Sequence, residues 1–142
     1  MQKGFLILLF SLILFAREIP QDLLQKLHLQ GAKIGVVDFF ASWCHSCRFE
    51  IPRIMDVAHK NKDVKFVGVA IDDNPSDAKR FVNRLGIDMP VVYDKEHTIV
   101  SWFNPVGVPA LYILKDGKIV GNIIGAHEDI GELLTQKIES LR

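Results

Sequence analysis

Residues 37–48 read VDFFASWCHSCR, and they place two cysteines, Cys44 and Cys47, where an apolar stretch ends. The β-branched and aromatic residues of the preceding segment, 34–40, predict a buried strand. Residues 44–61 are predicted to form a helix, which the two cysteines open. Residues three positions apart share one face of a helix, so the two sulfur atoms are able to bond.

This placement activates Cys44. Its sulfur lies near free backbone N–H groups and the positive end of the helix dipole, and both favour the thiolate over the thiol. A disulfide between Cys44 and Cys47 closes a very short loop, so it removes only about 2 kcal/mol of chain entropy from the unfolded state. The spacing therefore favours a reactive pair over a structural disulfide.

Metal or haem binding is the competing interpretation of the cysteines. A closed zinc site needs four ligands, and the sequence has neither a second cysteine pair nor two histidines at the usual zinc spacing. Covalent haem attachment requires a histidine directly after the second cysteine, where this chain has Arg48. We therefore predict no metal site, and copper held with His45 remains the minor alternative.

The remaining segments alternate between strands and helices. We expect strands over residues 64–71, 90–93, 110–114 and 118–124, and helices over residues 20–29, 74–86, 95–102 and 128–140. The pair Asp116-Gly117 is a strong hairpin signal between the last two strands. This order predicts an α/β fold with a central mixed sheet flanked by helices.

The composition fits a single domain. The chain has 142 residues, with 17 basic and 17 acidic side chains, so its formal net charge is zero. A neutral chain gives no support for a nucleic-acid binder, and we predict no nucleic-acid partner.

The first residues are predicted to be a targeting segment rather than part of the domain. An apolar run over residues 4–16 follows Lys3. As a helix it would span roughly 20 Å, which is short of a ~30 Å hydrocarbon core. We therefore expect a signal peptide over residues 1–16, or an uncleaved N-terminal membrane anchor, and a domain over residues 17–142 outside the cytoplasm.

With the motif at 37–48, four further segments carry a family resemblance. They read FEIP at 49–52, IDD at 71–73, MPVVYD at 89–94 and GVPALYIL at 107–114. From about residue 18 to 142 the chain resembles the thioredoxin superfamily, and within it the TlpA/ResA/CcmG branch of periplasmic thiol–disulfide oxidoreductases. The resemblance implies a thioredoxin-like fold, a redox-active Cys44–Cys47 pair and no other cofactor.

The resemblance also assigns roles near the dithiol. It makes Cys44 the exposed nucleophile and Cys47 the more buried, resolving thiol. Trp43 would pack beside the dithiol and contact substrate, with a plain core aromatic as the alternative. Pro109 would be a cis-proline packed against the dithiol, and Val108 would offer its backbone to a substrate strand.

Two carboxyl groups and two residues inside the motif complete the expected site. Asp38 lies on the buried strand, where burial should raise its pKa, and it resembles the proton-transfer aspartate of thioredoxins. Glu50 shares a helix face with Cys47 and resembles an acidic residue that tunes the cysteines. The alternatives are that Asp38 reaches solvent and that Glu50 is an ordinary exposed helix charge. His45 and Ser46 are expected to tune the pair, with a solvated ring of little effect as the alternative for His45.

The implied activity is exchange of disulfides with exported proteins. By resemblance to its branch, the direction is reduction, with apocytochrome c or another exported protein as substrate. The electrons would come from a membrane donor of the DsbD or CcdA type, and the domain would be periplasmic, with a tether to the inner membrane if the anchor is kept. The alternatives are an oxidant like DsbA and a copper- or haem-handling chaperone on the same fold.

Overall fold

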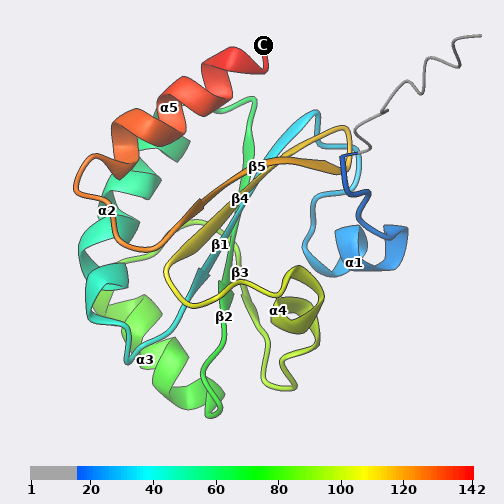
Figure 1. The fold of residues 1–142 in the computed structure, drawn as a ribbon. Coiled ribbons are helices and arrows are strands. Elements are labelled where there is room, and N and C mark those ends of the chain that lie inside the picture. The colour runs from blue at the N-terminus through cyan, green and yellow to red at the C-terminus, as the bar shows by residue number, and fades with distance from the viewer. Residues whose placement is uncertain (1–15) are drawn as a thin grey trace, which may run out of the picture.

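A computed structural model describes residues 16–142 of the protein. The strands are β1 (Ile34–Phe40), β2 (Lys65–Ala70), β3 (Val91–Tyr93), β4 (Ala110–Lys115) and β5 (Lys118–Ile124). Within residues 16–142 they form one five-stranded sheet in the order β3-β2-β1-β4-β5 (Figure 1). Neighbours are parallel from β3 to β1, whereas β4 runs antiparallel to both β1 and β5. The predicted mixed sheet is therefore confirmed.

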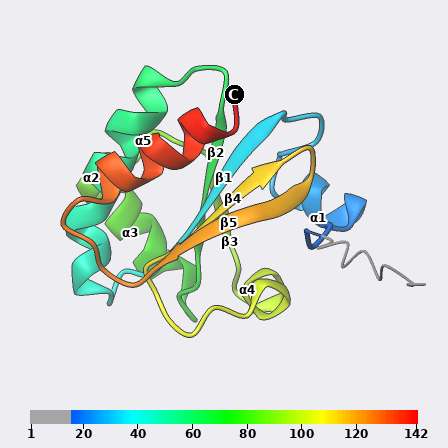
Figure 2. The same cartoon turned by 45° about the horizontal axis from the view of Figure 1, so that its top comes forward.

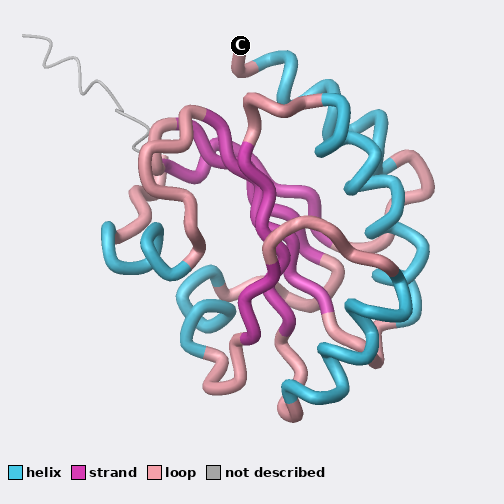
Figure 3. Tube along the Cα trace, turned by 180° about the vertical axis from the view of Figure 1, so that it is seen from behind, coloured by secondary structure: helices cyan, strands magenta, loops and turns pink. Residues whose placement is uncertain are grey.

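Helices cover both faces of this sheet, as the view from behind also shows (Figure 3). They are α1 (Gln21–Lys26), α2 (His45–Lys60), α3 (Pro75–Leu85), α4 (Thr98–Phe103) and α5 (Ile130–Ser140). Helices α2, α3 and α5 lie on one side of the sheet, and α1 and α4 lie on the other (Figure 2).

The central strand β1 is buried on both faces. Val36 and Phe40 point into the core formed with α2, α3 and α5. Val37 and Phe39 point into the core formed with α1 and α4. Because both faces are covered, the strand needs apolar residues throughout. Asp38 is the one charged residue in its sequence, IGVVDFF. Asp38 shares the face of Val36 and Phe40, and so lies on the α2 side.

Three helix ends differ from the sequence prediction by two residues or more, and the other ends agree to within one residue. Helix α1 ends at Lys26 rather than Leu29, and α5 begins at Ile130 rather than Glu128. Helix α4 begins at Thr98 rather than Lys95. The Asp94 carboxylate accepts the N–H groups of Ile99 and Val100 at 3.1 and 2.8 Å, which caps the helix at that point.

The predicted hairpin is confirmed at Asp116-Gly117. Both residues have positive φ, 50° and 77°, as the two central residues of a type I′ hairpin turn require. Glycine adopts such a φ without steric cost, and aspartate tolerates it better than most residues.

The expected signal peptide or anchor lies almost wholly in residues 1–15, outside the described part. From Ala16 onward, no helix combines the length and the apolar character needed to cross a membrane. The described chain begins along the hairpin, where Glu18 forms a β-bridge with Lys118 and the Ile119 N–H donates to the Arg17 carbonyl at 2.9 Å.

Candidate active site

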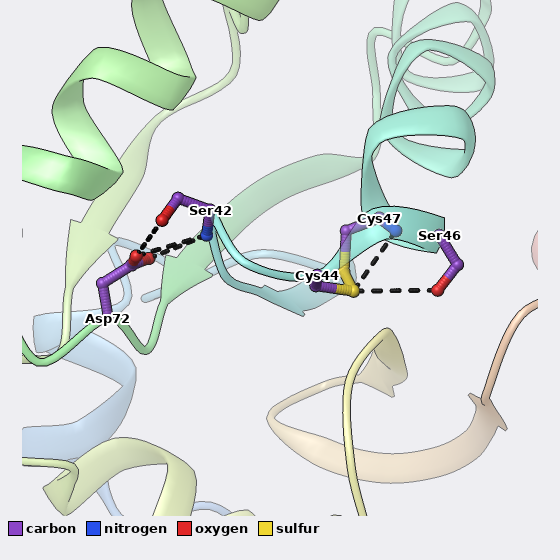
Figure 4. The surroundings of a disulfide bond; sticks show 5 residues. All are labelled: Ser42, Cys44, Ser46, Cys47 and Asp72. Atoms are coloured by element: carbon purple, nitrogen blue, oxygen red, sulfur yellow. Dashed lines mark hydrogen bonds between the residues drawn. A yellow bond between two sulfur atoms is a disulfide. The ribbon is translucent and has the colours of Figure 1, made fainter.

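The two cysteines form a disulfide at the start of α2 (Figure 4). Their Cα atoms are 5.4 Å apart, and Cys44 is the N-cap residue of the helix. Its Sγ accepts the backbone N–H of Cys47 at 3.3 Å, and the Ser46 hydroxyl lies 3.7 Å from the same sulfur. The helix N-terminus is therefore aimed at Cys44, as the sequence predicted.

Cys44 is the more accessible cysteine, although both are buried in this disulfide form. It retains 5% of its surface, whereas Cys47 retains none. The order agrees with an outer and an inner thiol, but Cys44 is much less open than the sequence led us to expect. In this form the Cys44 sulfur is bonded to the sulfur of Cys47.

Pro109 lies beside this loop because of the strand register. Ala110 pairs with Phe39 of β1, so the residue before it lies where β1 ends and the dithiol loop begins. The Val108–Pro109 peptide bond is cis, as predicted, and Pro109 is buried. Val108 is partly buried and packs against both cores.

Large apolar side chains near the dithiol are exposed. Trp43 is 68% exposed, so it is not a core aromatic, and Phe49 on α2 is 56% exposed. Val106, in the loop before Pro109, is 97% exposed. His45 is also exposed, and its ring meets the Phe49 ring edge to face at 5.1 Å. An exposed apolar surface of this kind is typical of a protein-binding site.

Asp38 is a carboxyl group buried in the core of the described domain. It is 1% exposed, and among residues 16–142 neither of its oxygens has a hydrogen-bond donor. Burial raises the pKa of Asp38 well above its usual value, and the nearby Glu50 carboxyl raises it further. The predicted shift is confirmed, and the alternative in which Asp38 reaches solvent is wrong.

Glu50 is also buried, at 3% exposure, so it is not an ordinary exposed helix charge. Its Oε2 has no hydrogen-bond partner in the described part of the chain. Burial raises the pKa of Glu50. A backbone hydrogen bond from His127, the charge of the His127 ring and that of Arg53 oppose this rise in that order.

The sequence analysis gave no role to His127, which the structure brings to Glu50. His127 lies in the loop between β5 and α5, and its Nε2 is 3.0 Å from the Ile124 carbonyl. Together with Glu50 and Phe49 it lines an open hollow of about 810 Å³ beside the first turns of α2. No local pattern marks His127, because α2 and this loop are far apart in the sequence.

The sequence also assigned no role to Asp72, in the loop after β2. Its carboxylate accepts the backbone N–H and the hydroxyl of Ser42, two residues before Cys44. Nowhere in residues 16–142 do three His, Cys, Asp or Glu side chains gather in a way that would hold a metal ion.

Comparison with known proteins agrees with this geometry. Residues 21–122 match the AhpC/TSA family. The thiol-disulfide oxidoreductase ResA of Bacillus thuringiensis (strain Al Hakam) is 31% identical over 109 residues, which cover 68% of this chain and 63% of ResA. The chain thus spans a little under two thirds of the length of this relative.

Solved structures show the same fold. The structure of MTB dsbF superimposes with a TM-score of 0.71 at 26% identity, covering 78% of this chain and 82% of the other. StoA from Bacillus subtilis gives 0.66 at 22% identity, over 74% and 81% of the two chains. The expected thioredoxin-like fold and the resemblance to this group of thiol–disulfide proteins are confirmed.

Proposed function

We propose that this chain, which belongs to the AhpC/TSA family, is a thiol–disulfide oxidoreductase that exchanges disulfides with proteins through Cys44 and Cys47. One observation carries the proposal. Cys44 caps α2 with its sulfur, which accepts the Cys47 N–H, and the partner sulfur follows one turn later. A thiolate at that place is stabilised by a hydrogen bond and by the helix dipole.

The reaction as a reductant has two exchange steps. The Cys44 thiolate attacks one sulfur of a partner's disulfide, forming a mixed disulfide and releasing the partner's other sulfur as a thiolate. The Cys47 thiolate then attacks the Cys44 sulfur, which closes the Cys44–Cys47 disulfide and frees the second sulfur of the partner. The partner gains two electrons and the dithiol loses two.

Buried carboxyl groups supply a route for the proton of Cys47. Cys47 has no exposed surface, so its thiol needs an internal acceptor before it attacks. Asp38 and Glu50 are buried, belong to elements that meet on the α2 side of the sheet, and have raised pKa values. We assign proton transfer to Asp38 and tuning of the pair to Glu50, with His45 and Ser46 acting on Cys44 from inside the motif.

The exposed surface around the dithiol fits a protein substrate. Trp43 offers an apolar contact beside the disulfide, and Val108 and Pro109 lie at the edge of the same loop region. A partner segment in extended form would pack on Trp43 and use the backbone of Val108. This fits a macromolecular disulfide better than a small oxidant, which needs no such contact area.

The proposed oxidoreductase also has a compartment, the periplasm, and a direction of electron transfer, from the dithiol to its partner. The apolar run at 4–16 after Lys3 supports export, followed by cleavage or by anchoring in the inner membrane. We propose a periplasmic reductant of exported proteins, with apocytochrome c as the leading substrate, recharged by a membrane donor of the DsbD or CcdA type. Resemblance to the ResA branch supports this direction.

Substitution of each cysteine in insulin-reduction assays tests the activity. Cys44→Ser should abolish reduction of insulin, because it removes the attacking sulfur. Cys47→Ser should lose turnover yet accumulate a mixed disulfide through Cys44, visible as a covalent adduct on non-reducing gels. Full activity in Cys44→Ser would refute the oxidoreductase and leave a metal- or haem-handling chaperone as the better account.

A further inference from the structure

We propose that Asp72 is a positioning residue of the dithiol, since its carboxylate fastens Ser42 to the loop that follows β2. The inference rests on the proposed function and adds a residue to it. Asp72 lies between β2 and α3 and is 4% exposed. Figure 4 shows its carboxylate turned toward Ser42, with the Cys44–Cys47 disulfide farther along the same loop.

The contact between Asp72 and Ser42 has several hydrogen bonds. The Ser42 backbone N–H donates to Oδ1 and Oδ2 of Asp72 at 3.1 and 3.3 Å, and the Ser42 hydroxyl is bonded to Oδ2. Among residues 16–142, Ser42 supplies every hydrogen bond that this carboxylate receives. Bonds to a buried carboxylate are stronger than those between neutral groups, so the contact holds the Ser42 backbone firmly.

Sheet topology explains why these two loops meet. Strands β1 and β2 are parallel neighbours, and Phe40 is in register with Ala70. Both strands therefore end at the same edge of the sheet, where the Ile71 N–H donates to the Phe40 carbonyl at 2.9 Å. Asp72 is the next residue along and reaches the loop that leads to Cys44.

The loop that carries Asp72 is itself held from its other side. His97 Nε2 lies 2.8 Å from the Ile71 carbonyl and 3.3 Å from Asp73 Oδ1. The His97 backbone N–H donates to the Asp94 carbonyl at 2.9 Å, which ties His97 to the turn before α4. The residues on both sides of Asp72 are therefore held by His97, and the hydrogen bonds from Ser42 to Asp72 restrict the movement of Ser42.

The expected consequence is an easier closure of the disulfide. Within the turn that leads to the helix, the Cys44 N–H donates to the Ala41 carbonyl at 3.1 Å, so hydrogen bonds hold this turn at both Ser42 and Cys44. A fixed turn keeps the Cys44 sulfur near Cys47 and raises the effective concentration of one thiol at the other. Without Asp72 the turn would gain freedom in the dithiol form, and the disulfide would be less favoured.

The equilibrium between the Cys44–Cys47 pair and a glutathione series tests this. In Asp72→Ala we expect the equilibrium constant to shift toward the dithiol by roughly tenfold, the scale of a lost charge-assisted hydrogen bond. In Asp72→Asn the amide oxygen still accepts the Ser42 N–H, so the shift should stay within about threefold. Equal shifts in both variants would mean that charge, rather than positioning, is responsible, and would overturn the proposal.

Asn61→Ala is the matched control. Asn61 is also buried, at 8% exposure, and its side chain donates to the Val57 carbonyl at 2.7 Å and accepts from Arg142. It follows the last residue of α2, at the opposite end of that helix from Cys44. The substitution should lower the melting temperature as Asp72→Ala should, and leave the glutathione equilibrium near that of the wild type. An unchanged equilibrium in Asp72→Ala, or an equal shift in Asn61→Ala, contradicts the proposal.

A milder variant keeps the test decisive if Asp72→Ala does not fold. Ser42→Ala removes the hydroxyl contact and keeps the backbone one, so a shift of about threefold toward the dithiol is expected. No shift in folded Ser42→Ala, with Asp72→Ala unfolded, would overturn the proposal. A wild-type protein that reaches no disulfide equilibrium at all would instead refute the proposed function.

Discussion

At the scale of single residues, the site depends on a carboxyl group that destabilises the fold once it ionises. Asp38 is buried, without a hydrogen-bond donor in the described residues, and its pKa is raised by burial and then by Glu50. The folded protein therefore holds the Asp38 proton more tightly than the unfolded chain does. The stability that this proton contributes is fully present below the pKa of Asp38 in the unfolded chain, near 4. It is lost as the pH rises through the pKa of Asp38 in the folded protein.

Asp38→Asn should remove this pH dependence, because an amide does not ionise. From about pH 4 upward, the free energy of unfolding of the wild type should fall relative to the variant by up to about 1.4 kcal/mol per pH unit. Urea unfolding of both proteins at pH 4, 5.5, 7 and 8 measures the difference. Asp56→Asn on the exposed side of α2 is the control, and a difference independent of pH would contradict the account of Asp38.

At the scale of elements, close packing of side chains from neighbouring strands limits which residue a strand position tolerates. Gly68 of β2 is the cross-strand partner of Asp38. A Cβ atom at Gly68 would lie 2.8 Å from Phe40 Cε1 and 3.2 Å from Met89 Cε. Phe40 has no exposed surface, so its ring has little freedom to move away.

Gly68→Ala should therefore lower the free energy of unfolding by about 1–3 kcal/mol, the usual cost of overpacking a core. Gly35→Ala in β1 is the matched control, since its added Cβ would find its nearest neighbour, Leu29, at an ordinary 3.5 Å. That variant should stay within about 0.5 kcal/mol of the wild type. Chemical unfolding of the two variants measures both values, and an equal loss in each would contradict the packing account.

Element order was predictable because each element carries a local signal. The buried strand at β1, the Asn74-Pro75 start of α3 and the Asp116-Gly117 hairpin all depend on neighbouring residues, and the structure has them where expected. The start of α4 was not predictable. It depends on the side chain of Asp94 accepting two specific N–H groups, an arrangement that composition does not reveal.

At the scale of the whole molecule, the site joins residues that are far apart along the chain. The dithiol, Pro109 and Asp38 were predicted from motif and strand pattern, and the structure places them around the carboxyl end of β1. The burial of Glu50, its contact with His127 and the contact of Asp72 with Ser42 were not predicted. Each depends on the packing of one loop against a distant one, which a single sequence does not report.

The reduction potential of the Cys44–Cys47 couple tests the central claim most directly. It is obtained by equilibrating the wild-type protein with a glutathione or dithiothreitol series and measuring the fraction of disulfide. The account predicts a reversible two-electron couple near thioredoxin's value of roughly −270 mV, as a dedicated reductant needs. A value near roughly −120 mV would contradict the reductant and indicate a strong oxidant, with His45 as the first residue to substitute.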